Sequence, residues 1–547
     1  MQGTSRKLGV GKESDTDADS FPHPRSPLPN VDAASTSVLI VGAGPTGLVL
    51  AISLARRGVP VRIIDRNAEP STTSRAVAVQ ARVLEFYQQM GLAAAVVDRG
   101  VRADALNLWV GGRRAARVPI GPVGADMTPF PFVLIFPQDA HERLLIERLA
   151  TLGVHVERST TLTALAQDED CVHATLEHAG GRKTQCDARY VAGCDGAHSA
   201  VRQALAIGFP GATYSKYFYV ADVEGSGPTT NGEVNVSIDE ADFLIVFPMR
   251  GPGRTRLIGV ARDDSGGDHG DVRFEDVSHI ALRELGVSVA HVNWFSTYHV
   301  HHRVASRFRD RRAFLLGDAA HIHSPVGGQG MNTGISDAIN LAWKLADVLQ
   351  GRAAARLLDS YEPERIAFAR RLVATTDRLF TLVTAEGRFA AFIRARLAPV
   401  IASIGSRIGA IRRFMFRTVS QIVIEYRASP LSEGGSGKVR AGDRLPWVRM
   451  DGSDNFAPLA SLDWQAHLYG EPAQDPASAC RELGIPLHRF PWSPGAATAG
   501  LHRGAFYLVR PDGYIGFADP GCDPAALRRY CAAWELAPAP LPTFARA

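Results

Sequence analysis

Two glycine-rich segments contain the residue types that could bind a nucleotide. The first, Gly42-Ala43-Gly44-Pro45-Thr46-Gly47, has the spacing GxGxxG. In this pattern the first glycine permits a tight turn, the second lets the backbone approach a pyrophosphate, and the third lets a helix pack on a strand. The second segment runs from Gly317 to Leu345 and begins with Gly-Asp. Together they predict two halves of one dinucleotide site.

The elements around the first segment suit a phosphate site. The apolar residues 38–41 predict a buried parallel strand, and the spacing of 48–57 predicts a helix whose N-terminal amides point at the phosphates. A second strand is expected over 59–64. Asp65 ends it, 18 residues after Gly47. An acid about 20 residues beyond the glycines commonly binds the ribose.

The second segment repeats this arrangement. Residues 313–316 predict another short strand, and Asp318 follows it at the end where ligands bind in open α/β sheets. Residues 332–349 predict a helix, preceded by Gly327, Gly328 and Gly330. The alternative is an ordinary strand-loop-helix unit without a ligand. Three glycines beside an acid favour a site.

With these motifs the chain resembles the single-component FAD-dependent aromatic hydroxylases, the class A flavoprotein monooxygenases with the p-hydroxybenzoate hydroxylase fold. Residues 194–202, CDGAHSAVR, are similar to the family's DG motif, which contributes to FAD and nicotinamide binding. Residues 74–85 and 136–139 are similar to segments that bring an arginine and a glutamine to FAD. The cofactor-binding residues that the resemblance implies are Gly42, Gly44, Pro45, Thr46, Gly47, Asp65, Arg66, Arg75, Gln138, Asp195, Gly196, Asp318, Gly328, Gly330, Met331 and Asn332.

The resemblance also implies a reaction. NADH or NADPH docks transiently and reduces FAD, reduced FAD takes up O₂ as a flavin hydroperoxide, and one oxygen passes to a phenolic or related small aromatic substrate. Two alternatives stay open on the same scaffold. One is Baeyer–Villiger-type or epoxidising oxygen insertion on a polycyclic or polyketide substrate. The other is a flavin reductase without oxygen transfer.

Ring activation requires a base or a positive field, because phenols titrate near pH 10. His321 and His323 lie in the predicted flavin loop, and Pro325 matches a family proline whose carbonyl lies near the substrate. Tyr217 and Tyr219 share one face of a predicted strand, since side chains alternate. Each candidate has an alternative interpretation. The histidines would be hydrogen-bonded to backbone, and the tyrosines would serve packing.

We predict no metal site. His299, His301 and His302 have suitable side chains, but no further ligand follows at compatible spacing. The six cysteines include no CxxC pair, which is typical of free thiols in a reducing compartment. No apolar run reaches the length of a membrane span, and the N-terminus does not resemble a signal peptide. The net charge of +4 argues against nucleic-acid and membrane partners. We therefore expect a cytoplasmic protein.

The expected fold is α/β. A Rossmann-like FAD-binding domain, 37–207 and 305–375, carries an inserted, mostly antiparallel substrate sheet over 208–304. Residues 1–36 are polar and expected to be disordered. A helical connector over 376–428 is basic and amphipathic. Packing or a subunit interface is favoured for it over a membrane surface. Residues 439–547 are similar to the thioredoxin-like domain of phenol hydroxylase relatives, and we expect it to contribute to a homodimer.

Overall fold

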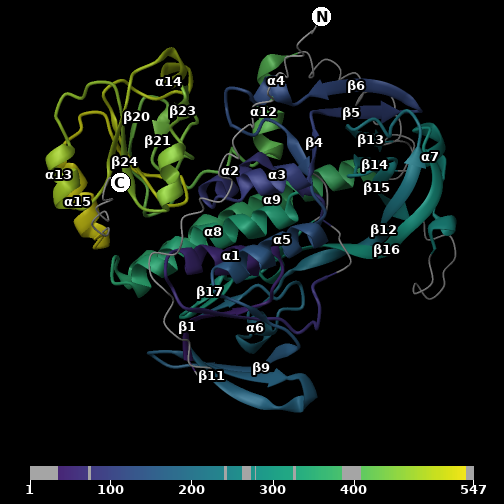
Figure 1. Ribbon diagram of the computed structural model, residues 1–547, viewed down its shortest axis with the longest axis horizontal. Helices are drawn as coiled ribbons and strands as arrows, with labels where there is room; N and C mark the ends of the chain where they lie inside the picture. The colour runs from purple at the N-terminus through teal and green to yellow at the C-terminus, as the bar shows by residue number, and fades with distance from the viewer. Residues whose placement is uncertain are drawn as a thin grey trace, which may run out of the picture.

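The computed structural model (Figure 1) describes residues 35–71, 76–238, 243–261, 273–277, 279–323, 328–384 and 408–537. The prediction of disorder for the N-terminal segment, and the predicted roles of Arg75, Pro325 and Gly327, therefore lie outside the described residues. So does the middle of the predicted connector, residues 385–407. No helix within the described ranges is long and apolar enough to cross a membrane.

A parallel sheet forms the base of the molecule in Figure 1. Its order is β17-β18-β11-β1-β2-β8, and β9 and β10 extend it as an antiparallel meander from β11. Residues 38–40 of the central strand are fully buried, as the continuous apolar run predicts. The strands are β1 (Ser35–Val41), β2 (Val61–Ile64), β8 (Val156–Glu157), β9 (Thr160–Gln167), β10 (Val172–His178), β11 (Lys183–Gly193), β17 (Arg309–Asp310) and β18 (Ala313–Leu315).

Helices α1 (Pro45–Arg56), α5 (Gln138–Thr151) and α8 (Gly330–Leu349) pack together above this sheet. Helix α1 follows the glycine loop, α5 follows β7, and α8 begins within the second glycine-rich segment. Their N-termini can therefore all contribute to one site. Helix α8, predicted over 332–349, begins two residues earlier than expected, at Gly330. The other described helices are α2 (Ala81–Gln89), α3 (Ala93–Arg99), α4 (Gly121–Gly124), α6 (Ala200–Ala204), α7 (Ile280–Glu284), α9 (Tyr361–Thr384) and α12 (Gly409–Val419).

A second, mostly antiparallel sheet stands to the right in Figure 1, with the order β19-β16-β12-β15-β14-β13-β5-β6. It includes a hairpin from residues 105–119, which the sequence analysis placed in the FAD-binding segment. Strand β5 pairs in parallel with β13, matching Leu106 with Val234. The strands are β5 (Ala105–Val110), β6 (Arg113–Pro119), β12 (Gly211–Ser226), β13 (Val234–Ile238), β14 (Phe243–Pro248), β15 (Arg254–Ala261), β16 (Ser288–Val304) and β19 (His321–Ile322).

The two faces of this sheet pack against different partners. Its outer face packs on α7 and the short 3-10 turn at Phe274–Asp276. Its inner face packs on a small sheet that adjoins the part of the chain with the first sheet. That small sheet has the order β3-β7-β4 and consists of β3 (Ala78–Val79), β7 (Val133–Ile135) and β4 (Val101–Ala103). Inner-face residues can therefore approach the nucleotide site, whereas outer-face residues cannot.

The C-terminal residues form a separate α/β unit, at the left of Figure 1, with the sheet order β21-β20-β27-β26-β24-β25. Its elements are β20 (Glu433–Ser436), β21 (Val439–Arg440), β22 (Arg449–Met450), β23 (Ser453–Asp454), β24 (Gln465–Tyr469), α13 (Ala477–Glu482), β25 (Leu487–Phe490), α14 (Pro494–Thr498), β26 (Phe506–Val509), β27 (Ile515–Asp519) and α15 (Pro524–Trp534).

Buried charges join this unit to helices α8 and α9. Glu364 on α9 accepts from Lys344 Nζ on α8 and from Arg510 Nη1 of the C-terminal unit, each at 2.8 Å. All three side chains are fully buried. Burial lowers the pKa of Lys344 to about 8, against the opposing attraction of Glu364. Breaking such a buried pair on one side typically costs about 3–5 kcal/mol. The C-terminal unit is thus fixed against the helix that begins at the predicted flavin loop.

Candidate active site

The three glycines of the first motif differ in what surrounds them. Gly42 has φ +103°, and a Cβ there would lie 2.4 Å from the carbonyl oxygen of Cys194. A Cβ on Gly47 would lie 2.0 Å from the carbonyl oxygen of Gly42. A Cβ on Gly44, the residue that caps α1, would meet no atom within 4 Å. Gly42 and Gly47 thus serve close packing, while Gly44 faces the open space where a pyrophosphate could approach.

Asp65 fixes the ends of the two neighbouring strands. Its Oδ2 accepts a hydrogen bond of 2.8 Å from the Ala43 amide in the glycine loop. Its Oδ1 accepts one of 2.9 Å from the Asn67 amide, and Arg158 Nη1 lies 3.8 Å away. The side chain of Asp65 is nevertheless 12% exposed. Arg66, which the resemblance also implicates, is exposed beside it.

The DG motif lies directly behind the glycine loop. Asp195 Oδ2 accepts hydrogen bonds from the amides of Ala200 at 2.6 Å and Val201 at 3.2 Å. Its other oxygen, Oδ1, is buried and has no hydrogen-bond partner among the described residues. Burial raises the pKa of this carboxyl group, although several hydrogen bonds oppose the rise. Gly196 follows with φ +77° and open space at its Cβ position. A buried, partnerless acceptor beside an open loop is typical of a site built for a ligand.

Arg202 connects the DG motif to the second glycine-rich segment. Its Nη1 donates to the Ala319 carbonyl at 2.8 Å, and its Nη2 donates to the Ala197 carbonyl at 2.6 Å. Ala319 adjoins Asp318 in a 3-10 turn, Gly317–Ala319. Asp318 is exposed, whereas both of its neighbours are buried. Its carboxylate therefore lies at the surface of the site, 123 positions after Asp195 in the sequence and beside it in the fold.

Close packing at Thr46 joins the two half-sites. A Cβ on Gly317 would lie 2.8 Å from Thr46 Oγ1, and one on Gly334 would lie 2.3 Å from the same atom. Only glycine fits at both positions. Pro45, the first residue of α1, is buried at the same helix N-terminus. The structure thus brings together the two segments that the sequence predicted to share one site.

The loop before α8 is tied to strand β3. Asn332 is fully buried, and its Nδ2 donates to the carbonyls of Ala78 at 2.9 Å and Gly328 at 2.8 Å. Its Oδ1 accepts from the Gln80 amide at 2.8 Å. The side chain of Asn332 is therefore hydrogen-bonded to protein groups, and these bonds fix the shape of the loop. Gly330 and Met331 next to it are only partly buried.

Gln138, the first residue of α5, lies at the same β3 segment. Its backbone amide donates to the Ala76 carbonyl at 3.1 Å, and its side-chain amide donates to Glu142 Oε1 at 2.8 Å. The side chain is partly exposed. Burial raises the pKa of Glu142, against the lowering effect of Gln138. Gln138 is thus held next to the segment that precedes β3, where the predicted Arg75 lies outside the described residues.

The two candidate histidines are placed differently. His321 is 2% exposed, its Nε2 lies 2.8 Å from Asp337 Oδ2, and its ring stacks on Phe308. The partner of His321 is thus a buried carboxylate and not the backbone group that the alternative interpretation named, and this burial does not favour His321 as a base acting on a substrate. His323 is partly exposed, and its ring lies 3.9 Å from the Cβ position of Gly330 at the start of α8.

Tyr217 and Tyr219 do share one face, but it is the outer face. Tyr219 is 3% exposed, stacks on Phe295, and makes an edge contact with Phe274. The Tyr217 ring lies against His299 in a tilted arrangement, with ring centroids 3.8 Å apart. This placement does not favour a substrate contact by either tyrosine, because α7 and the turn beside it cover this face. Packing, the alternative interpretation, describes them better.

Neither of the candidate tyrosines predicted from the sequence lies on the inner face. Tyr298 lies there against Phe218, with ring centroids 6.0 Å apart. Arg256 is 1% exposed, forms an ion pair with Asp222 at 2.6 Å, and lies over the Trp294 ring. Because side chains alternate along a strand, Tyr217 and Tyr219 lie on one face of β12, and Phe218 and Val220 lie on the other. Both pairs of side chains are largely apolar, so polarity does not distinguish the two faces. The sequence offered no signal to decide which set faces the nucleotide site.

The residues present fit a flavin dinucleotide. Gly44 leaves an open approach, Asp195 offers a buried acceptor, and the carboxylates of Asp65 and Asp318 stand at two separate ends of the joined half-sites. Such a set can take a ribose hydroxyl, a pyrophosphate beside a helix N-terminus and a second polyol.

Comparisons with known proteins agree with this geometry. A family model described as "FAD binding domain" matches residues 35–376. The chain is 35% identical to 6-methylpretetramide 4-monooxygenase of Streptomyces rimosus, over 88% of this chain and 91% of that protein. It is 32% identical to pentachlorophenol 4-monooxygenase of Sphingobium chlorophenolicum, over 65% and 66% of the two chains. A solved anhydrotetracycline hydroxylase from Streptomyces rimosus, 29% identical, superposes with a TM-score of 0.73 over 92% of this chain and all of that one.

Proposed function

The chain belongs to the FAD-dependent aromatic hydroxylases, and we propose that this monooxygenase uses NADH or NADPH to hydroxylate a fused-ring phenol. The reduced nicotinamide supplies two electrons. One atom of O₂ replaces a ring hydrogen as a hydroxyl group, and the other leaves as water. When bound, FAD supplies the electron transfer and the activation of O₂. The protein supplies position, charge and exclusion of water.

The residues of the two half-sites would hold FAD along its length. Gly44 and the N-terminus of α1 would face the pyrophosphate, Asp65 would bind the adenosine ribose, and Asp318 would bind the ribityl chain. Asp195 Oδ1 would accept a hydrogen bond from the dinucleotide, since it has no hydrogen-bond partner among the described residues. The segment Gly328–Asn332, held to β3 through Asn332, would support the flavin ring.

One observation carries the placement of the substrate. The chain passes from Asp318 into β19, which is the edge strand of the second sheet and pairs with β16 at Arg303 and Val304. It then enters the loop before α8. The half-site for FAD and the substrate sheet are therefore one continuous piece of chain. The inner face of that sheet, with Phe218, Trp294 and Tyr298, is the wall from which a substrate can approach the flavin loop.

A wide aromatic wall favours a flat, fused-ring substrate. Phe218 and Tyr298 pair through their rings, and aromatic side chains prefer such stacked and edge contacts. Two relatives that match most of the chain act, by their names, on 6-methylpretetramide and on anhydrotetracycline. Among the predicted bases, His323 follows β19 directly and lies at the start of α8. We infer that His323 receives the phenolic proton, because ionisation makes the ring electron-rich.

Oxidation of NADH and NADPH by the FAD-loaded enzyme, with simple phenols, fused-ring phenols and non-phenolic polycyclic ketones, tests this proposal. We expect fused-ring phenols to accelerate nicotinamide oxidation and to gain one oxygen. With ¹⁸O₂ the product should contain one labelled hydroxyl group. A ring-expanded ester in the product spectrum would instead establish Baeyer–Villiger insertion. Nicotinamide oxidation that no aromatic compound affects, in air or without it, would establish a reductase.

A further inference from the structure

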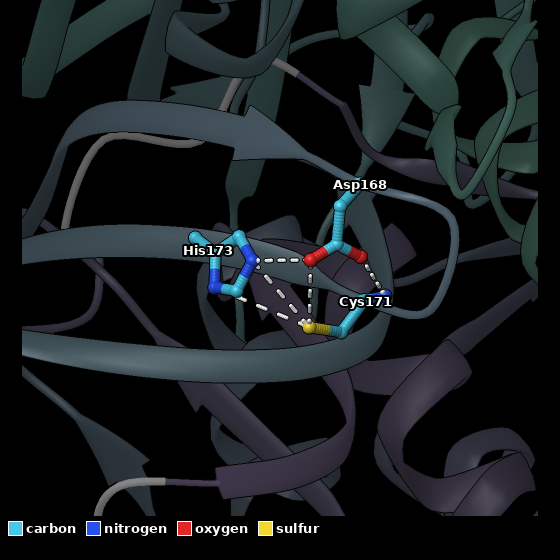
Figure 2. Close-up of side chains that lie close together, drawn as sticks. All are labelled: Asp168, Cys171 and His173. Atoms are coloured by element: carbon cyan, nitrogen blue, oxygen red, sulfur yellow. Dashed lines mark hydrogen bonds and ion pairs between the residues drawn. The ribbon is translucent and has the colours of Figure 1, made fainter.

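A second group of reactive side chains lies far from the nucleotide site, in the turn between β9 and β10. Asp168 directly follows the first strand of this hairpin, Cys171 directly precedes the second, and His173 is the second residue of that second strand. Figure 2 shows the three side chains converging on one point at the surface. This is the one group of three or more potential metal ligands among the described residues. Cys171 is also the one described cysteine that is not buried.

The distances between the ligand atoms suit a small metal ion. His173 Nε2 lies 2.8 Å from Asp168 Oδ2 and 3.6 Å from Cys171 Sγ, and Sγ lies 3.9 Å from Oδ2. In a tetrahedral zinc site, bond lengths near 2.0 Å to N and O and 2.3 Å to S place the ligands about 3.3–3.5 Å apart. No pair therefore needs to move by more than about half an ångström.

The histidine ring is oriented as metal-bound histidines usually are. Its Nδ1 lies 2.8 Å from Oδ1 of Asp187, which faces it across the β10–β11 pair. When Nδ1–H donates to this carboxylate, the Nε2 lone pair is directed toward Asp168 and Cys171. A carboxylate behind a histidine fixes the tautomer and the ring orientation in metal sites.

Asp168 is positioned by the turn itself. Its Oδ1 accepts hydrogen bonds from the amides of Asp170 at 2.7 Å and Cys171 at 2.8 Å, so Oδ2 is the oxygen left for a metal. The turn is anchored from outside as well. Arg312 donates through Nε to the Glu169 carbonyl at 2.9 Å, and Arg311 Nη2 donates to the Gln167 carbonyl at 3.1 Å. The ligands therefore lie on a braced backbone, which lowers the cost of binding.

We propose that this turn binds a divalent transition-metal ion of the zinc type through Asp168 Oδ2, Cys171 Sγ and His173 Nε2. Nitrogen, oxygen and thiolate sulfur together suit Zn²⁺, whereas Mg²⁺ and Ca²⁺ prefer oxygen alone. Asp187 positions the histidine and does not bind the ion. Asp170 and Glu169 add negative charge around the turn. This charge attracts a cation and offsets the positive charge of the nearby Arg311 and Arg312. Solvent completes the coordination, since His173 and Asp168 are about half exposed, at 43% and 54%.

Metal binding to the tag-free, FAD-loaded full chain tests the proposal. After treatment with a chelator, we expect one Zn²⁺ per chain in competition with a chromophoric chelator. Cys171→Ser and His173→Gln should abolish this binding, and Asp187→Asn should weaken it roughly 10- to 100-fold. With Co²⁺, the difference absorption spectrum should contain a thiolate charge-transfer band that Cys171→Ser removes.

Two matched variants serve as controls. Glu177→Gln changes an exposed acid on the same strand, and His155→Gln changes an exposed histidine elsewhere. Both should bind Zn²⁺ as the unmodified chain does. Absence of Zn²⁺ binding, or binding that survives Cys171→Ser and His173→Gln unchanged, would overturn the proposal. Because the readout is metal stoichiometry and spectrum, the result is independent of monooxygenase activity.

Discussion

His321 Nε2 and the backbone amide of Gly317 both bind the same oxygen of Asp337, at 2.8 and 2.9 Å. The other oxygen of Asp337 accepts from Arg365 Nε at 2.5 Å. Burial alone would raise the pKa of Asp337, but Arg365 and His321 hold it below its ordinary value. Asp337 thus ties α8 to the turn that presents Asp318, and His321 is part of that tie.

His321→Gln should therefore lower stability and leave the chemistry unchanged. Losing a buried partner of Asp337 should reduce the free energy of unfolding by about 1–3 kcal/mol. The kcat per bound FAD, and its pH profile, should not change. Urea unfolding and kcat measured across pH check this. In parallel, His323→Gln should lower kcat and remove one limb of the pH profile. The opposite pattern would return the catalytic role to His321.

Alanine at Gly44 should lower FAD affinity without changing the fold, whereas alanine at Gly47 should impair folding itself. In Gly44→Ala the new methyl meets no protein atom, so the fold and Tm should be retained while it obstructs the approach of the pyrophosphate. FAD affinity should fall. In Gly47→Ala the methyl would lie 2.0 Å from a carbonyl oxygen, so the chain should fold poorly. Tm and flavin content of both variants are the measurements. Full flavin content in Gly44→Ala would mean that this glycine does not face the cofactor.

Asp318→Ala should cost FAD binding. A hydrogen bond to a charged group contributes about 1.5–3 kcal/mol, so the dissociation constant for FAD should rise about 10- to 100-fold. Flavin fluorescence during titration of the apoprotein measures it. Asp98→Ala, an exposed acid on α3, is the matched control and should bind FAD normally. Equal affinity in both variants would contradict the role given to Asp318.

Substitutions on the two faces of the second sheet should separate packing from substrate contact. Tyr298→Ala removes an aromatic contact on the inner face. Such contacts contribute about 0.5–1.5 kcal/mol, so KM for the aromatic substrate should rise about 3- to 10-fold. Tyr219→Phe, on the outer face, should leave KM and kcat unchanged. A large effect of Tyr219→Phe with none of Tyr298→Ala would reverse the assignment of the faces.

Stability should fall in mild acid because of His141. Burial lowers its pKa to about 3, and its Nε2 lies 2.6 Å from the Tyr87 hydroxyl. The unfolded chain takes up a proton near pH 6.5, while the folded chain keeps the ring neutral. Stability is therefore present above pH 6.5 and is lost as the pH falls toward 3. Between pH 7 and 5 the loss is about 2 kcal/mol. Urea unfolding at both pH values should show that His141→Gln loses correspondingly less.

The two glycine-rich segments could be recognised in the sequence because their structural requirements are local. Gly42 must adopt a positive φ and Gly47 must pack closely, and such demands leave glycines at fixed spacing next to acids such as Asp65 and Asp318. The joining of the two half-sites was predictable for the same reason. Gly317 faces Thr46 at a distance that only glycine permits.

The missing parts depend on contacts between distant segments. Nothing near His321 in the sequence indicates that Asp337 would bind it, since either could face solvent. Strand alternation groups Tyr219 apart from Phe218, but does not tell which side the FAD-binding part covers. The turn with Asp168, Cys171 and His173 lacks the spacing of common zinc motifs. It becomes a candidate only because pairing of β10 with β11 brings Asp187 behind the histidine.

The parallel pairing of β5 with β13 has a consequence for synthesis of the chain. On the ribosome the β5–β6 hairpin emerges more than one hundred residues before Val234, the partner of Leu106, becomes available. Until then one edge of the hairpin has no partner, and an open strand edge invites pairing with other nascent chains. The outer strand, β6, carries Arg113, Arg114 and Arg117. Strand β6 stays at the edge of the finished sheet, and charge on an edge strand repels a second copy, so these arginines protect the β6 edge and leave the waiting β5 edge open.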